Sequence, residues 1–175
     1  LSSGSTGAPK IIWKDYQSWF SAFQSQTEVF GVSSVDKVMV VDALGYSANL
    51  NTVLHTLWLG GTVLLSPLVH ANSWSILIKK HKINFLFLVP SHYRLLPDNQ
   101  SFTNINSVVS AGEKLDVKLA EKLLRIFPNA QLTEYYGAAE LGHISYIQNY
   151  EIITKPTSVG KPFPGEGITI KDDKI

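Results

Sequence analysis

Apolar positions along the chain alternate between short continuous runs and stretches of helical spacing. The runs at 37–41, 62–65, 83–89 and 107–110 have the length and composition of buried strands, and between them apolar residues recur at helical spacing over 50–58, 73–81 and 116–127. Strands covered on both faces become almost entirely apolar, as in parallel sheets flanked by helices. The pattern therefore predicts an α/β fold, with a mostly parallel sheet and helices on both of its faces.

The remaining pattern is less regular. Asp15 can cap a helix that places Trp19 and Phe23 on one side, and short extended segments are predicted at 11–13 and 168–170. In a sheet of this kind, ligands bind at the carboxyl ends of the strands, where the strand order reverses. The loops after Val41, Val89, Ser110 and Tyr136 are therefore the predicted ligand-binding positions.

Composition and charge restrict the functions that the chain can have. The 175 residues, 45% of them apolar, suffice for a sizeable core, and a net charge of +1 gives no basic excess of the kind that nucleic-acid binding needs. No apolar run approaches the roughly 18 residues of a membrane span. The absence of cysteine excludes a disulfide framework and fits a reducing, cytoplasmic setting. The five histidines show no metal-ligand spacing.

The first ten residues are the most distinctive stretch. Glycines let backbone N–H groups converge on an anion, hydroxyls add donors, and Lys10 adds a positive charge. The stretch is not a Walker A loop, because Pro9 and Ile11 stand where that motif requires Gly and Ser or Thr. It is either a phosphate cradle or a flexible linker. The candidate phosphate-binding residues are Ser2, Ser3, Gly4, Ser5, Thr6, Gly7 and Lys10.

Two motifs together indicate a family. Residues 2–10 resemble the phosphate loop [ST]SG[ST]TGxPKG of the adenylate-forming enzymes, which include acyl-CoA synthetases, with Ile11 in place of the last glycine. Residues 136–140 resemble that family's YGxTE motif, with Ala139 in the Thr position. Residues 159–162 resemble its VGKP turn, which precedes a β subdomain. The resemblance predicts an α/β AMP-binding subdomain over 1–157 and the incomplete start of a β subdomain over 158–175.

The resemblance also implies site roles and substrates. Thr6 and Lys10 would act on the phosphates of ATP, and Glu140, a hard oxygen ligand, would hold Mg²⁺. Adenine would lie along Tyr136, Gly137 and the Gly112-Glu113 turn, whereas Tyr46, His92 and Ala111 would line the acyl pocket. Coenzyme A would be the co-substrate.

Each of these residues also has a purely structural interpretation. Tyr136 can be a core aromatic, Glu140 a charge at a helix N-terminus, and the others ordinary loop residues. The sequence predicts a piece of an ATP-dependent acyl-CoA synthetase of fatty-acid or o-succinylbenzoate type, an AMP-forming acid–thiol ligase. The alternatives are a non-catalytic nucleotide-binding piece and a peptide synthetase adenylation domain. The piece alone is predicted to be inactive, because the family's catalytic C-terminal domain is absent from it. The particular carboxylic acid and the oligomeric state stay open.

Overall fold

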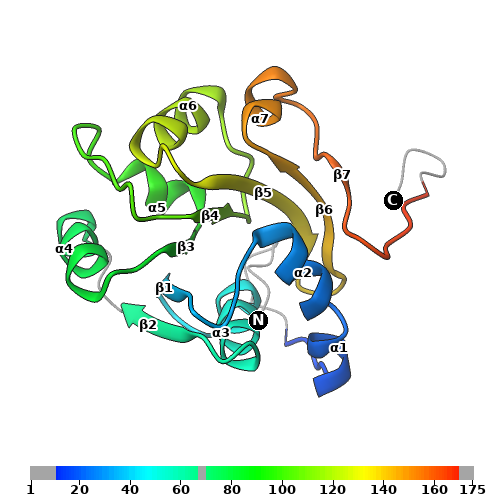
Figure 1. Ribbon diagram of the computed structural model, residues 1–175. Coiled ribbons are helices and arrows are strands. Elements are labelled where there is room, and N and C mark those ends of the chain that lie inside the picture. Colours follow the sequence, from blue (N-terminus) through cyan, green and yellow to red (C-terminus); the bar gives the residue numbers. More distant parts are fainter. Residues whose placement is uncertain (1–10, 67–69, 170–175) are drawn as a thin grey trace.

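A seven-stranded sheet forms the centre of the molecule (Figure 1). The computed structural model describes residues 11–66 and 70–169. The strand order is β2-β1-β3-β4-β5-β6-β7; the first five strands in this order are mutually parallel, and β6 and β7 are antiparallel to their neighbours. The strands are β1 (Lys37–Val41), β2 (Thr62–Ser66), β3 (Phe85–Leu88), β4 (Ser107–Ser110), β5 (Gln131–Ala138), β6 (Gly142–Gln148) and β7 (Lys161–Pro162).

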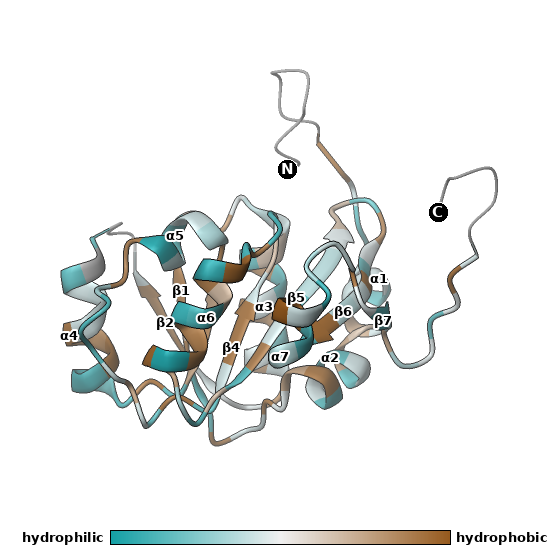
Figure 2. Cartoon of the chain, turned by 90° about the horizontal axis from the view of Figure 1, so that it is seen from above, coloured by the Kyte–Doolittle hydropathy of each residue, from teal (hydrophilic) through white to brown (hydrophobic). Residues whose placement is uncertain are grey.

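Helices cover both faces of this sheet, as the sequence predicts. Figures 1 and 2 show α4 to α7 on one face and α2 and α3 on the other, with the apolar strands between the two layers. The helices are α1 (Tyr16–Phe20), α2 (Phe23–Phe30), α3 (Ser47–Trp58), α4 (Ala71–His81), α5 (Pro90–Arg94), α6 (Val117–Ile126) and α7 (Tyr150–Thr154).

Side-chain alternation along the strands divides the core in two. Met39 and Val41 of β1 pack into a cluster that contains Trp74 of α4 and Leu123 of α6. Their neighbours Val38 and Val40 pack instead with residues of α2 and α3. Because successive side chains of a strand point to opposite faces, each strand must be apolar throughout to fill both clusters. This is the physical origin of the continuous apolar runs.

Several helix ends follow local signals. The Asp15 carboxylate accepts a hydrogen bond from the Ser18 backbone N–H at 2.8 Å and caps α1, and Asp116 caps α6 through Leu119 N–H at 2.8 Å. Gly31 ends α2 with φ +63°. The single helix predicted after Asp15 is wrong, because the chain turns after Phe20 and α2 begins separately.

Two predicted extended segments and two helices were also misjudged. Residues 11–13 form no strand, and Trp13 is 92% exposed without a strand partner among the described residues. Residues 168 and 169 are not in a strand, and 170 lies outside the described residues. Helices α5 and α7 were not predicted, because they are only five residues long and offer no full helical period.

The segment after α7 continues the same sheet. β7 pairs with β6, with Ser145 opposite Pro162, and Phe163 is buried against the residues of the α2–α3 face. The predicted subdomain boundary at 157/158 stays a prediction. Within the described part of the chain, no helix is long and apolar enough to cross a membrane.

Candidate active site

A cavity of about 590 Å³ opens at the carboxyl ends of the parallel strands. Its wall contains the residues that follow β1, β3 and β4, together with the end of β5. β1 pairs with β2 on one side and with β3 on the other, so the strand order reverses between β1 and β3. Ligands of open α/β sheets bind at such a reversal, and the loops after Val41, Val89 and Ser110 meet here as predicted.

The structure brings together almost all of the predicted site residues that it describes. The lining includes Tyr46, His92, Ala111, Gly112, Glu113, Gly137 and Glu140. Tyr136 is absent from the lining and is 44% exposed, because it alternates on β5 with the buried Tyr135, which does line the cavity. The predicted phosphate loop, with Thr6 and Lys10, lies outside the described residues. The chemical roles assigned to all these residues remain predictions.

A buried carboxylate holds the turn that carries Gly112 and Glu113. Glu134 on β5 is 5% exposed, and its carboxylate accepts hydrogen bonds from the Leu115 backbone N–H at 2.8 Å and from Lys114 Nζ at 2.5 Å. Lys114 Nζ also donates to the Ser158 carbonyl at 2.8 Å. Sequence reasoning missed this residue, although a charged residue inside an apolar strand is a signal of buried pairing.

The hairpin between β5 and β6 carries Glu140 to the cavity. The register shifts between Tyr136 and Gly137, and a Cβ built on Gly137 would lie 2.3 Å from the Gly142 carbonyl oxygen. Only glycine permits this close approach of the two strands. The Glu140 side chain is exposed at the end of this hairpin, where its carboxylate is accessible to a ligand.

The carboxylates of the cavity can support magnesium only together with other ligands. No cluster of three or more His, Cys, Asp or Glu residues in the described ranges could hold a metal ion alone. Mg²⁺ in nucleotide sites commonly uses one or two carboxylates and completes its shell with phosphates and water. Glu140 fits such a site, and Glu113 is less available because Arg94 Nη1 lies 3.4 Å from its carboxylate.

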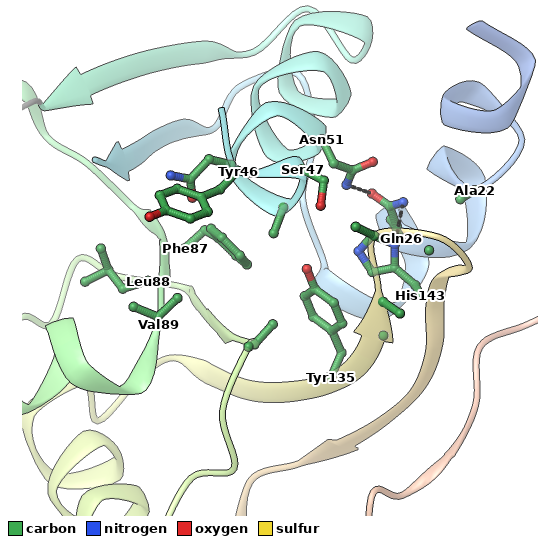
Figure 3. A pocket seen from close by; sticks show the side chains of 18 of the residues that line it. Ala22, Gln26, Tyr46, Ser47, Asn51, Phe87, Leu88, Val89, Tyr135 and His143 are labelled. Atoms are coloured by element: carbon green, nitrogen blue, oxygen red, sulfur yellow. Dashed lines mark hydrogen bonds between the residues drawn. The ribbon is translucent and has the colours of Figure 1, made fainter. Parts of the chain in front are cut away.

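The inner wall of the cavity is aromatic. Figure 3 shows Tyr46, Phe87, Tyr135 and His143 around one space. The ring centroids of Tyr135 and His143 are 4.4 Å apart, and Phe87 stacks against Tyr135 at 6.3 Å. Flat apolar surfaces of this kind suit the body of an organic acid or a nucleobase.

Polar side chains of three elements meet beside this wall. Asn51 Nδ2 on α3 donates to Gln26 Oε1 on α2 at 2.8 Å, and Gln26 Nε2 lies 3.2 Å from His143 Nδ1 on β6. Burial lowers the pKa of His143 to about 3, and the nearby His55 and Lys14 contribute. Sequence reasoning missed all three residues. The available signal was a polar residue at a buried position, since Gln26 lies between Phe23 and Phe30 on the buried face of α2.

The fold is that of an α/β domain with its cavity at the reversal of strand order. The chain belongs to the AMP-binding enzyme family, whose model matches residues 1–174. The resemblance noted in the sequence is therefore confirmed.

Individual relatives agree with the family. The chain is 32% identical over 177 residues to a protein named uncharacterized acyl-CoA ligase YhfT of Bacillus subtilis, covering 98% of this chain and 36% of YhfT. It is 29% identical to the putative long chain fatty acid-CoA ligase VraA of Staphylococcus haemolyticus, covering 98% of this chain and 37% of VraA. The chain thus spans about a third of the length of these relatives.

A solved structure confirms the fold. The o-succinylbenzoate coenzyme A synthetase MenE of Bacillus subtilis, in complex with ATP and magnesium ion, superimposes with a TM-score of 0.87 at 20% identity. The match covers 99% of this chain and 37% of MenE. An α/β domain with a mostly parallel sheet, as predicted, is therefore shared with an adenylate-forming enzyme.

Proposed function

We propose that the protein containing this chain is an AMP-forming acid–thiol ligase. A carboxylate oxygen of the acid attacks the α-phosphorus of ATP, pyrophosphate leaves, and the acyl-adenylate then passes its acyl group to the thiol of coenzyme A with release of AMP. The observation that carries the proposal is the convergence of Gly112, Gly137 and Glu140 on one cavity at the sheet reversal, in a chain that matches the family over 1–174.

The described residues would divide the substrates between two ends of the cavity. The Gly112-Glu113 turn and the β5–β6 hairpin would hold the nucleotide, and Glu140 would hold Mg²⁺, which neutralises charge on the phosphates. The acid would lie against Tyr46, His92 and Ala111, near the aromatic wall. Residues 2–10 would bind the β- and γ-phosphates. Fatty or aryl acids are the proposed substrates, and a cytoplasmic location the proposed setting.

The test is an activity measurement on the full-length protein. With ATP, Mg²⁺ and a panel of carboxylic acids, we expect pyrophosphate release, acyl-adenylate by mass spectrometry, and thioester once coenzyme A is added. Glu140→Gln should raise the Mg²⁺ concentration needed for half-maximal rate. The matched control Glu151→Gln removes an exposed carboxylate on α7, outside the cavity lining, and should leave the titration unchanged.

Other outcomes identify the alternatives. Nucleotide binding without pyrophosphate release from any acid would refute the ligase and favour a non-catalytic nucleotide-binding protein. Acyl-adenylate formation without transfer to coenzyme A would favour a carrier-protein acceptor, as in peptide synthetases. The 175-residue chain alone should form neither product.

A further inference from the structure

We propose that the cavity selects a carboxylic acid whose body carries a neutral oxygen acceptor, such as a ketone, ether or hydroxyl, and that this acceptor binds Nε2–H of His143. The inference rests on the proposed function and names the substrate class of the same cavity. It starts from the three linked side chains of Asn51, Gln26 and His143, which lie on different elements and are described here as the amide relay.

The amide relay determines which nitrogen of His143 carries the proton. Gln26 Oε1 accepts from Asn51 Nδ2 at 2.8 Å, so the other end of the Gln26 amide, Nε2, is a donor and faces His143 Nδ1 at 3.2 Å. With the two amides in this orientation the Gln26 amide nitrogen donates, and His143 Nδ1 is the unprotonated acceptor. The proton of the neutral imidazole then resides on Nε2. Gln26 is fully buried and Asn51 is 6% exposed, which holds this arrangement in place.

The resulting donor is unpaired within the described ranges. Among the described residues, neither His143 Nε2 nor the Tyr135 hydroxyl has a hydrogen-bond partner, although both residues line the cavity. Figure 3 shows the His143 ring and the hydroxyls of Tyr135 and Ser47 turned toward the same space. His143 Nε2–H and the Tyr135 hydroxyl can therefore both donate a hydrogen bond to an acceptor of the ligand.

The acceptor that fits is neutral. Burial keeps His143 uncharged at neutral pH, with a pKa of about 3. Its Nε2–H can therefore donate a hydrogen bond, but the ring carries no positive charge that would neutralise an anionic acceptor. The ammonium of the cavity lining, Lys14, interacts electrostatically with Glu140 and so is already opposed by a negative charge. A second carboxylate would lose its hydration in this wall and would have to compete with Glu140 for the Lys14 ammonium. An alkyl chain would leave the donors unpaired.

The experiment compares acids of equal length in pyrophosphate release by the full-length protein. The set contains an alkanoic acid, the corresponding keto, methoxy and amino acids with the substituent away from the carboxylate, and the dicarboxylic acid, each over a series of chain lengths. We expect kcat/KM for the best keto or methoxy acid to exceed that for the alkanoic acid by about tenfold or more, since a site built to hydrogen-bond its substrate rejects analogues that lack the group. The dicarboxylic and amino acids should be poor substrates.

Two variants test the assigned residues. His143→Phe keeps an aromatic ring and removes the donor, so it should reduce the preference to below about threefold by lowering turnover of the oxygen-bearing acid alone. Gln26 is a positioning residue, because its amide fixes the tautomer of His143. Gln26→Leu removes that amide and should likewise lower the ratio of kcat/KM for the oxygen-bearing acid to kcat/KM for the alkanoic acid. The control His81→Phe alters an exposed histidine outside the cavity lining and should leave the ratio unchanged.

Each result has a distinct meaning. Equal use of alkanoic and oxygen-bearing acids, or a preference unchanged in His143→Phe, would overturn this inference and leave the ligase assignment standing. A preference for the amino acid would assign the opposite tautomer and likewise overturn it. No pyrophosphate from any acid, with ATP still bound, would refute the proposed function itself and with it the inference.

Discussion

Removing the buried carboxylate of Glu134 should loosen the turn that positions Gly112 and Glu113. The Glu134 side chain is 6% exposed, whereas that of its partner Lys114 is 35% exposed. In Glu134→Ala, the Leu115 N–H loses the acceptor that now lies at 2.8 Å, and the Lys114 ammonium keeps only the Ser158 carbonyl at 2.8 Å. The substitution therefore leaves one buried donor unpaired and one half-buried cation without its counter-charge.

The expected cost follows from these exposures. Breaking a buried ion pair by deleting one partner typically costs about 3–5 kcal/mol. Because water reaches Lys114, we expect a loss at the lower end of this range. Glu134→Ala should decrease the free energy of unfolding by about 3 kcal/mol. Glu134→Gln retains an oxygen for the Leu115 N–H and loses only the charge, which should limit its cost to about 1–2 kcal/mol.

Two measurements check this prediction. Urea unfolding gives the free-energy change, and hydrogen exchange of the Leu115 amide reports directly on the turn, where protection should fall most in Glu134→Ala. The control Glu151→Ala removes the carboxylate of a pair whose N–O distance is 2.7 Å but whose partners are both more than half exposed, and should change stability little. A Glu134→Ala protein as stable as the wild type, or with unchanged Leu115 exchange, would refute the reasoning.

Three further predictions concern other sites. Gly137→Ala should lower adenylation at least tenfold, because its Cβ would lie 2.3 Å from the Gly142 carbonyl and the hairpin carrying Glu140 must shift; unchanged pyrophosphate release would contradict this. Ala139→Thr, which restores the family hydroxyl, should raise the adenylation rate, and a lower rate would argue that the turn is purely structural. Burial lowers the pKa of His55 from 6.5 to about 4, so the unfolded chain binds the extra proton first. His55 alone should therefore lower stability by about 2 kcal/mol between pH 7.5 and pH 5, an effect that levels off below pH 4. His143, whose pKa burial lowers to about 3, should add a loss of similar size, so in urea unfolding His55→Gln should remove about half of the total.

The strands and their layering could be predicted from sequence because the signal is local. The 37–41 and 107–110 runs are apolar on both faces, which only a sheet covered twice explains, and these limits recur in β1 and β4. The caps at Asp15 and Asp116 are also local, since each carboxylate binds an amide three residues ahead. The 11–13 segment failed because apolar side chains alone do not provide a strand partner.

The motifs likewise indicated which loops meet, whereas the tertiary structure decided which side chains line the cavity between these loops. Gly112, Gly137 and Glu140 were predicted from the resemblance to the family's motifs, and the strand ends that carry them lie at one edge of the sheet. On β5, the side-chain alternation turned Tyr135 rather than Tyr136 into the cavity. The amide relay joins residues that are far apart in the sequence: Asn51 and Gln26 are separated by 25 positions, and Gln26 and His143 by 117. No local pattern encodes these contacts, because they exist only once α2, α3 and β6 have packed against the same sheet face.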